Sequence, residues 1–255
     1  MTTILAIGNS FSQDATTYLY DIAKAEGIEL KVVNLYIGGC SLEMHWKNLG
    51  ANAAVYDYEL NGQETGRKIS IKEALQEEKW DYVALQQVSS DSGILDTYYP
   101  YIIKIQEYVK EQAPQAEQLL HQTWAYEIDS QHPDFAKYHL DQMEMYSAVI
   151  NTYKSLAEEL SLKIISCGKV IQNLRAVSEF DYANGGISLC RDGFHMHFIY
   201  GRYAVAATWY EFILHQNILD NVFSPQAVDN ETVNIEMINM IKTTVHNTVK
   251  SSLNG

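Results

Sequence analysis

Short apolar runs alternate with amphipathic segments along almost the whole chain. The apolar runs are rich in aliphatic and β-branched residues, as buried strands are, whereas the segments between them carry apolar residues at helical spacing. Strands are predicted over residues 2–8, 28–39, 80–90, 116–124 and 162–168. Buried strands that alternate with helices form parallel sheets covered by helices on both faces. The sequence therefore predicts an α/β protein, a three-layer α/β/α fold with a mostly parallel five-stranded sheet.

Helical segments and one hairpin complete the predicted architecture. Helices are expected over residues 12–26, 97–113, 135–160 and the last 25 residues. Ser70 and Glu73 form a capping box, which predicts that a further helix follows Ser70. Asn61-Gly62 suits a tight hairpin turn within residues 54–70, and residues 43–48 are expected in a loop. The sequence has no repeat and no Pro/Gly/Ser linker, so a single domain is predicted over residues 1–255.

Composition and charge exclude several classes of partner. With 47% hydrophobic residues among 255, the chain can bury a substantial core. A net charge of −14 repels phosphate backbones and anionic membranes. No apolar run reaches the ~18 residues of a membrane span. The oligomeric state is left open by these features.

Cysteine usage and the start of the chain bear on the compartment. Cys40, Cys167 and Cys190 lie far apart, which argues against a disulfide framework or a CxxC zinc site and favours a reducing compartment. The chain enters a strand directly, without a basic region followed by a long apolar stretch. We therefore expect a cytoplasmic protein, or a secreted or periplasmic one if a signal peptide has been removed.

Polar residues follow the predicted strands, at the sheet edge where α/β proteins bind ligands. Ser10 stands on the turn after the first strand, and Asp192 and His195 lie three residues apart near the end of the chain. A serine becomes an effective nucleophile when a base removes its proton and a third group orients that base. Ser10, His195 and Asp192 are therefore the predicted catalytic residues. Gly39 and Gln87, at the ends of the second and third strands, are the predicted oxyanion donors.

In the order of these residues the chain resembles the SGNH (GDSL-like) hydrolases. Gly8-Asn9-Ser10 ends the first strand, Asn34 to Gly39 ends the second, Gln86-Gln87 ends the third, and Asp192 to His195 comes late. The resemblance spans nearly the whole chain, and "GNSFS" is typical of a bacterial branch of this superfamily. It implies the flavodoxin-like SGNH hydrolase fold, and ester hydrolysis through an acyl-enzyme without a metal or organic cofactor.

Two departures from the family pattern affect the predicted site. Asn9 stands where the family has an aspartate beside the nucleophile, a position that does not accept the proton. The family's Gly-x-Asn-Asp after the third strand is missing. The resemblance then implies that the oxyanion is held by the N–H groups of Ser10 and Gly39 and by the amide of Gln87, with Gln86 as second choice.

The predicted substrate is a small or carbohydrate-borne acyl ester, with acetyl as the simplest acyl group. Aromatic side chains near the same sheet edge can stack on a sugar ring, although core packing is the default for tryptophan. The predicted substrate-binding residues are Asn9, Trp46, Trp124 and Tyr126.

Two other functions remain as alternatives. The altered motif after the third strand motivates a non-catalytic carbohydrate-binding protein on the same fold. A metal-dependent hydrolase is less favoured, because the chain has metal-ligand residue types but neither an HExxH motif nor a tight cluster. Those residues are His121, His132, His139, Asp192, His195 and His197. Cys40 beside Gly39 suggests a thiol nucleophile, but Ser10 is better placed.

Overall fold

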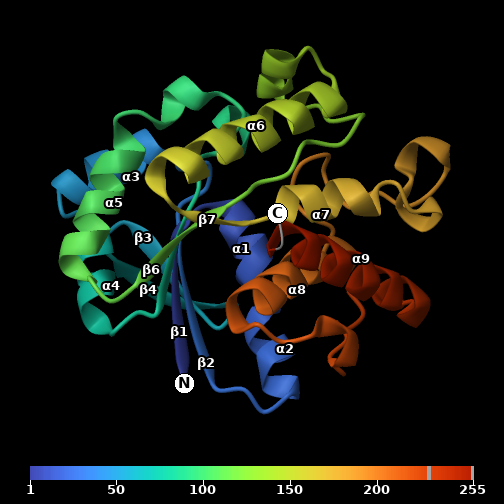
Figure 1. Ribbon diagram of the computed structural model, residues 1–255, viewed down its shortest axis with the longest axis horizontal. Coiled ribbons are helices and arrows are strands. Elements are labelled where there is room, and N and C mark those ends of the chain that lie inside the picture. The colour runs from blue at the N-terminus through green and yellow to red at the C-terminus, as the bar shows by residue number, and fades with distance from the viewer. Residues whose placement is uncertain (229–230, 254–255) are drawn as a thin grey trace.

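A mixed seven-stranded sheet lies at the centre of the protein (Figure 1), in a computed structural model that describes residues 1–228 and 231–253. The strands are β1 (Thr2–Gly8), β2 (Leu30–Tyr36), β3 (Tyr56–Leu60), β4 (Gln63–Ile69), β5 (Tyr82–Leu85), β6 (Glu117–His121) and β7 (Lys163–Ile165). Their order is β4-β3-β2-β1-β5-β6-β7. The five predicted strands form the parallel part, β2-β1-β5-β6-β7, which is the flavodoxin-like order. The predicted α/β class is confirmed.

The sheet has two strands more than predicted because the β3-β4 hairpin joins it. β3 pairs antiparallel to β2, and β4 pairs antiparallel to β3. Asn61 and Gly62 form the predicted turn with φ of 52° and 77°, the left-handed values that tight hairpin turns require. Tyr56 and Ile69 are buried. The hairpin therefore covers the open edge of β2 and extends the core.

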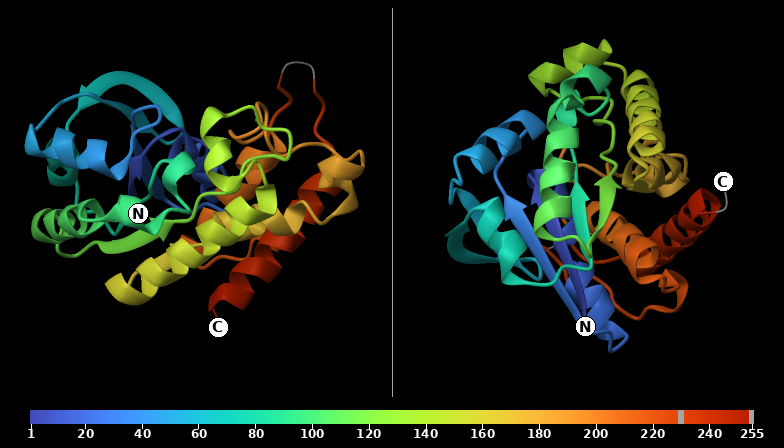
Figure 2. Two further views of the ribbon diagram at one scale, coloured as in Figure 1. Left: turned by 90° about the horizontal axis from the view of Figure 1, so that it is seen from above. Right: turned by 60° about the vertical axis from the view of Figure 1, so that its left-hand side comes forward.

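Helices cover both faces of the sheet (Figures 1 and 2). The α-helices are α1 (Ser10–Thr16), α2 (Leu19–Ala25), α3 (Leu42–Gly50), α4 (Ile71–Glu77), α5 (Tyr101–Gln112), α6 (Gln142–Leu160), α7 (Cys167–Leu174), α8 (Tyr200–Leu214) and α9 (Ile235–Leu253). The 3₁₀ helices are η1 (Ser89–Asp91), η2 (Leu95–Tyr98), η3 (Pro133–Tyr138), η4 (Ser178–Phe180), η5 (Tyr182–Asn184) and η6 (Ile218–Asp220). α8 packs against α1, α2, α7 and α9, whereas α3 and α4 pack against α5. Over the described ranges, no helix combines the length and apolarity needed to cross a membrane.

The helix predicted over residues 12–26 is broken in two. α1 begins earlier, at Ser10, and ends at Thr16, and α2 begins at Leu19. Near the break, the Thr16 hydroxyl donates to the Ser12 carbonyl (2.9 Å) and the Thr17 hydroxyl to the Gln13 carbonyl (2.7 Å). Side-chain bonds of this kind compete with the helix backbone, which explains the interruption.

Two other helix predictions need correction. The helix expected over residues 135–160 is divided into η3 and α6, because His139 and Leu140 take left-handed φ values of 53° and 58°. Residues 43–48, expected in a loop, belong to α3, whose first turn is capped by the Ser41 side chain. The C-terminal helix is present as α9, and residues 254–255 of that prediction lie outside the described residues. The Ser70–Glu73 capping box is confirmed at the start of α4.

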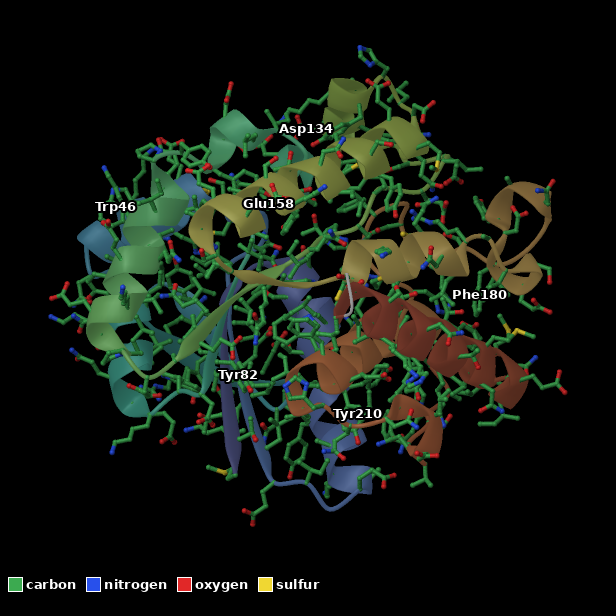
Figure 3. The ribbon with its side chains drawn as sticks, in the orientation of Figure 1. Trp46, Tyr82, Asp134, Glu158, Phe180 and Tyr210 are labelled. Atoms are coloured by element: carbon green, nitrogen blue, oxygen red, sulfur yellow. The ribbon has the colours of Figure 1, made fainter. Side chains whose placement is uncertain are left out.

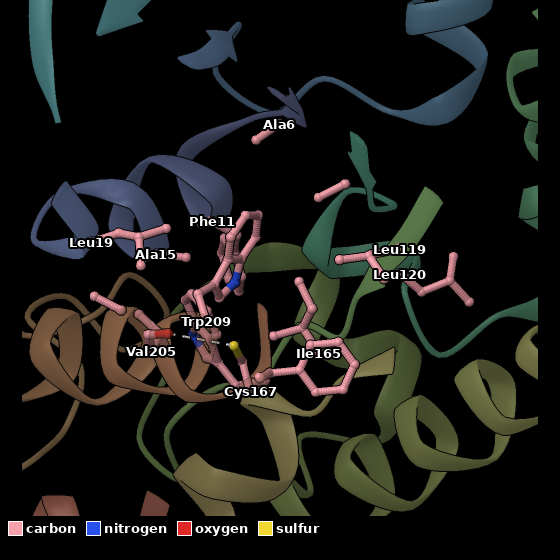
Figure 4. Packing of buried hydrophobic residues seen from close by; sticks show 14 of the residues in the cluster. Ala6, Phe11, Ala15, Leu19, Leu119, Leu120, Ile165, Cys167, Val205 and Trp209 are labelled. Carbon is pink, nitrogen blue, oxygen red and sulfur yellow. Dashed lines mark hydrogen bonds between the residues drawn. The ribbon is translucent and has the colours of Figure 1, made fainter. Parts of the chain in front are cut away.

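The core beneath the first strand end is built around α8 and α1 (Figure 4). α8 carries apolar residues on all its faces, with Arg202 and Glu211 as its charged residues, and it is almost entirely buried, as expected for a helix enclosed between other helices and a sheet. Phe11 of α1 stacks on Trp124 at 4.1 Å between ring centroids, and both side chains are buried. Trp209 of α8 is also fully buried. This packing fixes the helix that carries Ser10 at its first position.

We expect the buried His121, at the end of β6, to make the folded protein less stable in acid. The side chain is 1% exposed, and its ring packs edge-on against Trp209 at 5.1 Å. Neither ring nitrogen has a hydrogen-bond partner in the part of the chain that the structure describes. Burial lowers the pKa of His121 from 6.5 to about 3. Between these values the unfolded chain binds a proton that the folded protein does not, so the free energy of unfolding falls as the pH falls.

We expect the His121→Leu variant to lose part of this acid sensitivity. One histidine of this kind contributes about 1.4 kcal/mol per pH unit below its unfolded pKa. Relative to wild type, the variant should therefore gain about 2 kcal/mol of unfolding free energy between pH 7 and pH 5. Urea unfolding of both proteins at the two pH values measures this difference. If the two proteins differ in unfolding free energy by the same amount at both pH values, His121 has the same pKa in the folded and unfolded states.

Candidate active site

The turn after β1 presents Ser10 through a set of buried hydrogen bonds around Asn9. Gly8 precedes this turn, and a Cβ there would lie 2.2 Å from the Ser12 hydroxyl, so only glycine fits. Asn9 Oδ1 accepts from the Phe11 N–H at 3.0 Å and caps α1. Its Nδ2 donates to the Cys40 carbonyl at 3.0 Å. Asn9 is 1% exposed, so its prediction as a substrate contact is wrong: its polar atoms hold the turn instead.

Ser10, His195 and Asp192, predicted from the sequence as a catalytic set, lie in one hydrogen-bonded chain. His195 Nε2 is 2.9 Å from the Ser10 hydroxyl. His195 Nδ1 is 2.7 Å from Asp192 Oδ2. The other carboxylate oxygen, Asp192 Oδ1, accepts from the His195 N–H at 2.8 Å and from the Phe194 N–H at 3.2 Å. When Nδ1 carries the imidazole proton, Nε2 is free to accept one from Ser10.

The surroundings of the hydrogen-bonded Ser10, His195 and Asp192 side chains favour an ionised Asp192. Partial burial opposes the charged carboxylate, but hydrogen bonds from the side chain and backbone of His195 outweigh it and lower the Asp192 pKa below its usual value. The His195 ring lies 4.1 Å from the Phe194 ring, between centroids. The His195 side chain is 22% exposed and that of Asp192 42%, so a ligand can reach the site.

The two backbone positions predicted as oxyanion donors belong to turns that are joined by a hydrogen bond. Ser10 is the first residue of α1, where a backbone N–H has no intrahelical acceptor. Gly39 lies in the turn after β2, exposed, with φ of 64° and open space around it. The bond from Asn9 to the Cys40 carbonyl ties that turn to the nucleophile turn.

The glutamine amides are engaged elsewhere, and the prediction for Gln87 needs correction. Gln87 Nε2 donates to the carbonyl and hydroxyl of Thr97, at 3.0 and 3.2 Å. Its Oε1 accepts from the N–H groups of Leu42 and Val88, each at 2.9 Å. Gln86 Nε2, the second choice, donates to Asn9 Oδ1 at 2.7 Å. The bonds to Thr97 use both N–H groups of Gln87 Nε2, which leaves no donor there for an oxyanion. The Gln86 side chain is 1% exposed and donates to Asn9, and its Oε1 has no partner among the described residues.

Two of the three predicted aromatic substrate contacts are wrong. Trp124 and Tyr126 are both fully buried. Trp124 donates to the Phe194 carbonyl at 2.8 Å, and the Tyr126 hydroxyl bonds to that of Ser89 at 2.8 Å. The Tyr126 ring also packs against the Phe194 ring at 5.6 Å between centroids, so both residues support the loop that carries His195. Trp46 on α3 is partly exposed (Figure 3), with the Lys104 ammonium over its ring at 5.2 Å.

Sequence reasoning missed the aromatic contact of the His195 ring with Phe194, and considered His132 only as a possible metal ligand. Phe194 contacts the His195 ring and is itself packed edge-on against His132 at 4.8 Å. Burial lowers the pKa of His132. The only local signal for Phe194 is its place between Asp192 and His195 in the sequence. Nothing local in the sequence brings His132 to this site, because it comes from a connection preceding η3.

A second contact between a possible nucleophile and a histidine is buried: Cys40 Sγ lies 3.4 Å from His45 Nδ1. Cys40, predicted as a poorer nucleophile than Ser10, is fully buried, and burial raises the pKa of its thiol to about 12. Cys167 and Cys190 are also buried and free. Within the described ranges, no three His, Cys, Asp or Glu side chains are grouped as metal ligands.

Solved structures of low sequence identity share this architecture. A protein from Slackia heliotrinireducens described as "a putative SGNH hydrolase" has a TM-score of 0.57 at 19% identity, over 83% of this chain and 98% of that one. The acetyl xylan esterase AlAXEase has a TM-score of 0.56 at 14% identity, over 82% of this chain and 98% of that one. These likenesses show the fold: the protein has the SGNH hydrolase fold that the resemblance predicted. No curated protein matches the chain.

A nearer relative and a family model agree on the family. The crystal structure of a DUF4886 family protein from Bacteroides uniformis has a TM-score of 0.88 at 37% identity, over 98% of this chain and 95% of that one. Residues 3–247 match the family model described as "Domain of unknown function (DUF4886)". The chain therefore belongs to the DUF4886 family.

Proposed function

We propose that the protein is a serine esterase that hydrolyses an acyl ester, with acetyl as the simplest acyl group, of a small or carbohydrate substrate. The observation that carries the proposal is the continuous hydrogen-bonded chain from the Ser10 hydroxyl through His195 to Asp192. These are the three groups that nucleophilic acyl transfer needs, in the required order and at hydrogen-bond distances.

The proposed reaction has two halves. His195 Nε2 takes the hydroxyl proton of Ser10 as the Ser10 oxygen attacks the carbonyl carbon of the ester. Asp192 stabilises the imidazolium that forms and holds the ring in place. As the tetrahedral intermediate collapses, the imidazolium protonates the leaving alcohol and an acyl-enzyme on Ser10 remains. Water, deprotonated by His195, then attacks the acyl carbon, and the acid is released as the proton returns to Ser10.

Backbone groups are the proposed oxyanion donors. The N–H groups of Ser10 and Gly39 belong to two turns joined by the Asn9–Cys40 hydrogen bond. No side-chain donor after the third strand is included in the proposal, because Gln87 Nε2 donates twice to Thr97 and the buried Gln86 Nε2 donates to Asn9. Loss of one oxyanion donor lowers kcat by roughly 10²- to 10³-fold. We therefore expect an esterase that acts best on activated esters with good leaving groups.

The substrate class rests on charge and on fold-level likeness. A net charge of −14 disfavours anionic substrates, so a neutral ester is proposed. Trp46 keeps part of its ring exposed and is the remaining aromatic candidate for stacking on a sugar. Among proteins that share the fold is an acetyl xylan esterase, which supports an acetylated carbohydrate as the first class to test.

One observation favours a second candidate, a carbohydrate-binding protein without esterase activity. It is the engagement of both glutamine amides away from Ser10. The experiment that separates the two functions is reaction of the wild-type protein with a fluorophosphonate, followed by peptide mass spectrometry. The esterase proposal expects a covalent adduct on Ser10 in the folded protein and none after urea unfolding.

A panel of esters then tests the substrate class. Hydrolysis of p-nitrophenyl acetate, p-nitrophenyl butyrate and acetylated xylo-oligosaccharides should show measurable turnover, fastest for the acetyl esters. A folded protein that neither forms the Ser10 adduct nor hydrolyses any ester above background contradicts the esterase proposal. Binding of the oligosaccharides by calorimetry would in that case support the second candidate.

A further inference from the structure

A buried carboxylate lies one helical turn beyond the nucleophile. Asp14 is on α1, four residues after Ser10, and its side chain is fully buried. A buried charge is tolerated only with partners, and Asp14 has two arginines and one backbone N–H. Oδ1 accepts from Arg191 Nη1 at 3.0 Å and from Arg202 Nε at 2.7 Å. Oδ2 accepts from the Met196 N–H at 2.8 Å.

These contacts enclose the segment that carries Asp192 and His195. Arg191 immediately precedes Asp192, and Met196 immediately follows His195. The segment closes on itself through an antiparallel bridge between Cys190 and Met196, and the Arg191 N–H donates to the His195 carbonyl at 2.9 Å. The Arg191 guanidinium also donates to the Met196 carbonyl. Asp14 therefore holds both ends of this small loop at a single carboxylate.

The link matters because the base and the nucleophile come from opposite ends of the chain. The Ser10–His195 hydrogen bond joins residues 185 positions apart. The bond between His195 and Asp192, by contrast, lies within the loop itself. If the loop shifted as a unit, the hydrogen bond between Asp192 and His195 would remain. The His195 ring would nevertheless move relative to the Ser10 hydroxyl.

We propose that Asp14 is a positioning residue that sets the distance between Ser10 and His195 by fastening the Asp192–His195 loop to the helix that begins at Ser10. This inference rests on the proposed esterase function. Asp14 has no contact with the reacting atoms, and it acts through Arg191 and the Met196 backbone. The two guanidinium groups also lie over the Phe198 ring, at 4.7 and 4.9 Å, which helps to hold their orientation.

Arg202 supplies an internal control. It neutralises the same carboxylate, but it belongs to α8 and is outside the loop. If Asp14 acts only as a buried charge that needs balancing, loss of either arginine should have the same consequences. If Asp14 positions the loop, loss of Arg191 should affect catalysis far more than loss of Arg202.

The test compares Asp14→Asn, Arg191→Gln and Arg202→Gln in the full chain. We expect Asp14→Asn and Arg191→Gln to lower kcat for p-nitrophenyl acetate by roughly 10²-fold with KM little changed, because a displacement near 1 Å of a reacting group has an effect of that size. Arg202→Gln should stay within a few-fold of the wild-type kcat. Arg191 is partly exposed, so its variant decides the question if Asp14→Asn does not fold.

A spectroscopic readout makes the test independent of turnover. The low-field proton resonance of His195 Nδ1–H should persist in Asp14→Asn, because its partner Asp192 moves with it. The nitrogen resonance of His195 Nε2, which senses the Ser10 hydroxyl, should shift. Loss of both signals would instead indicate general disruption, and would overturn the positioning role.

The failure of this inference is distinguishable from failure of the proposed function. A wild-type protein that shows no ester hydrolysis and no Ser10 adduct contradicts the esterase, while the two resonances still report the position of the loop. An active wild type whose folded Asp14→Asn and Arg191→Gln variants keep the wild-type kcat overturns the inference. An Arg202→Gln variant as impaired as Arg191→Gln also overturns it, because charge balance then explains the effect.

Discussion

Replacing Ser10 with alanine is expected to lower kcat/KM for an activated acetyl ester by roughly 10⁴- to 10⁶-fold. The substitution removes the hydroxyl oxygen that is proposed to form the acyl-enzyme. The backbone N–H of residue 10 and the cap of α1 by Asn9 stay in place. The protein should therefore remain folded. Initial rates under saturating and limiting ester, with circular dichroism as the check on folding, measure the effect.

His195→Ala should be almost as damaging, and the double variant no worse than either single one. The two residues act as one unit across a 2.9 Å hydrogen bond, so removing one removes the contribution of the other. Ser178→Ala, at an exposed serine of η4, is the matched control and should keep the wild-type rate. A Ser10→Ala protein that retains turnover would move the nucleophile to another residue and contradict the proposed mechanism.

Asp192→Asn is expected to lower kcat by roughly 10²- to 10⁴-fold. Asp192 Oδ1 accepts two backbone N–H bonds, from Phe194 and His195, and these would hold the amide oxygen of an asparagine. The amide N–H₂ would then face His195 Nδ1, which would have to accept a hydrogen bond. That places the imidazole proton on Nε2, the atom that must accept the proton of Ser10.

Steady-state kinetics of Asp192→Asn between neutral and mildly alkaline pH measure this effect. Asp129→Asn is the matched control, because Asp129 is exposed and bonds the Tyr182 hydroxyl at 2.9 Å outside the Ser10–His195–Asp192 chain. The Asp192→Asn variant should show the weaker activity throughout this range, where the wild-type carboxylate is ionised because its pKa is lowered. Equal rates for the two variants would mean that the tautomer of His195 is not set by Asp192.

Local patterns were sufficient for the strands and for the order of the site residues. β1 occupies the same residues as its predicted strand, because a continuous apolar run bounded by glycine has a strong local signature. Ser10 was found for a similar reason, because it stands at the turn after a recognisable strand, whereas Asp192 and His195 were found from their spacing of three residues and from the resemblance to SGNH hydrolases. The structure places them at 2.7 and 2.9 Å from their partners, and their catalytic role stays a prediction.

The errors at the site concern orientation and burial. Gln87 is at the predicted strand end, but its amide turns to Thr97 because the η2 segment supplies a carbonyl there. Trp124 and Tyr126 lie near the predicted edge, but beneath the loop that carries His195, where they are fully buried. Residue type and spacing contain no information on which of two partners a buried amide chooses. That choice depends on residues far away in the chain.

By itself, the sequence determined the alternation of strands and helices, the place of the nucleophile turn and the presence of an Asp-x-x-His segment, because these depend on periodicity and neighbours. The tertiary structure decided which side chains are buried, how the hairpin joins the sheet and how the late loop reaches α1. The clamp of Arg191 and Met196 on Asp14 shows the reason. Asp14 has the sequence context of an ordinary solvent-facing helix residue, and only the packing of segments some 180 residues apart turns it into a buried anchor.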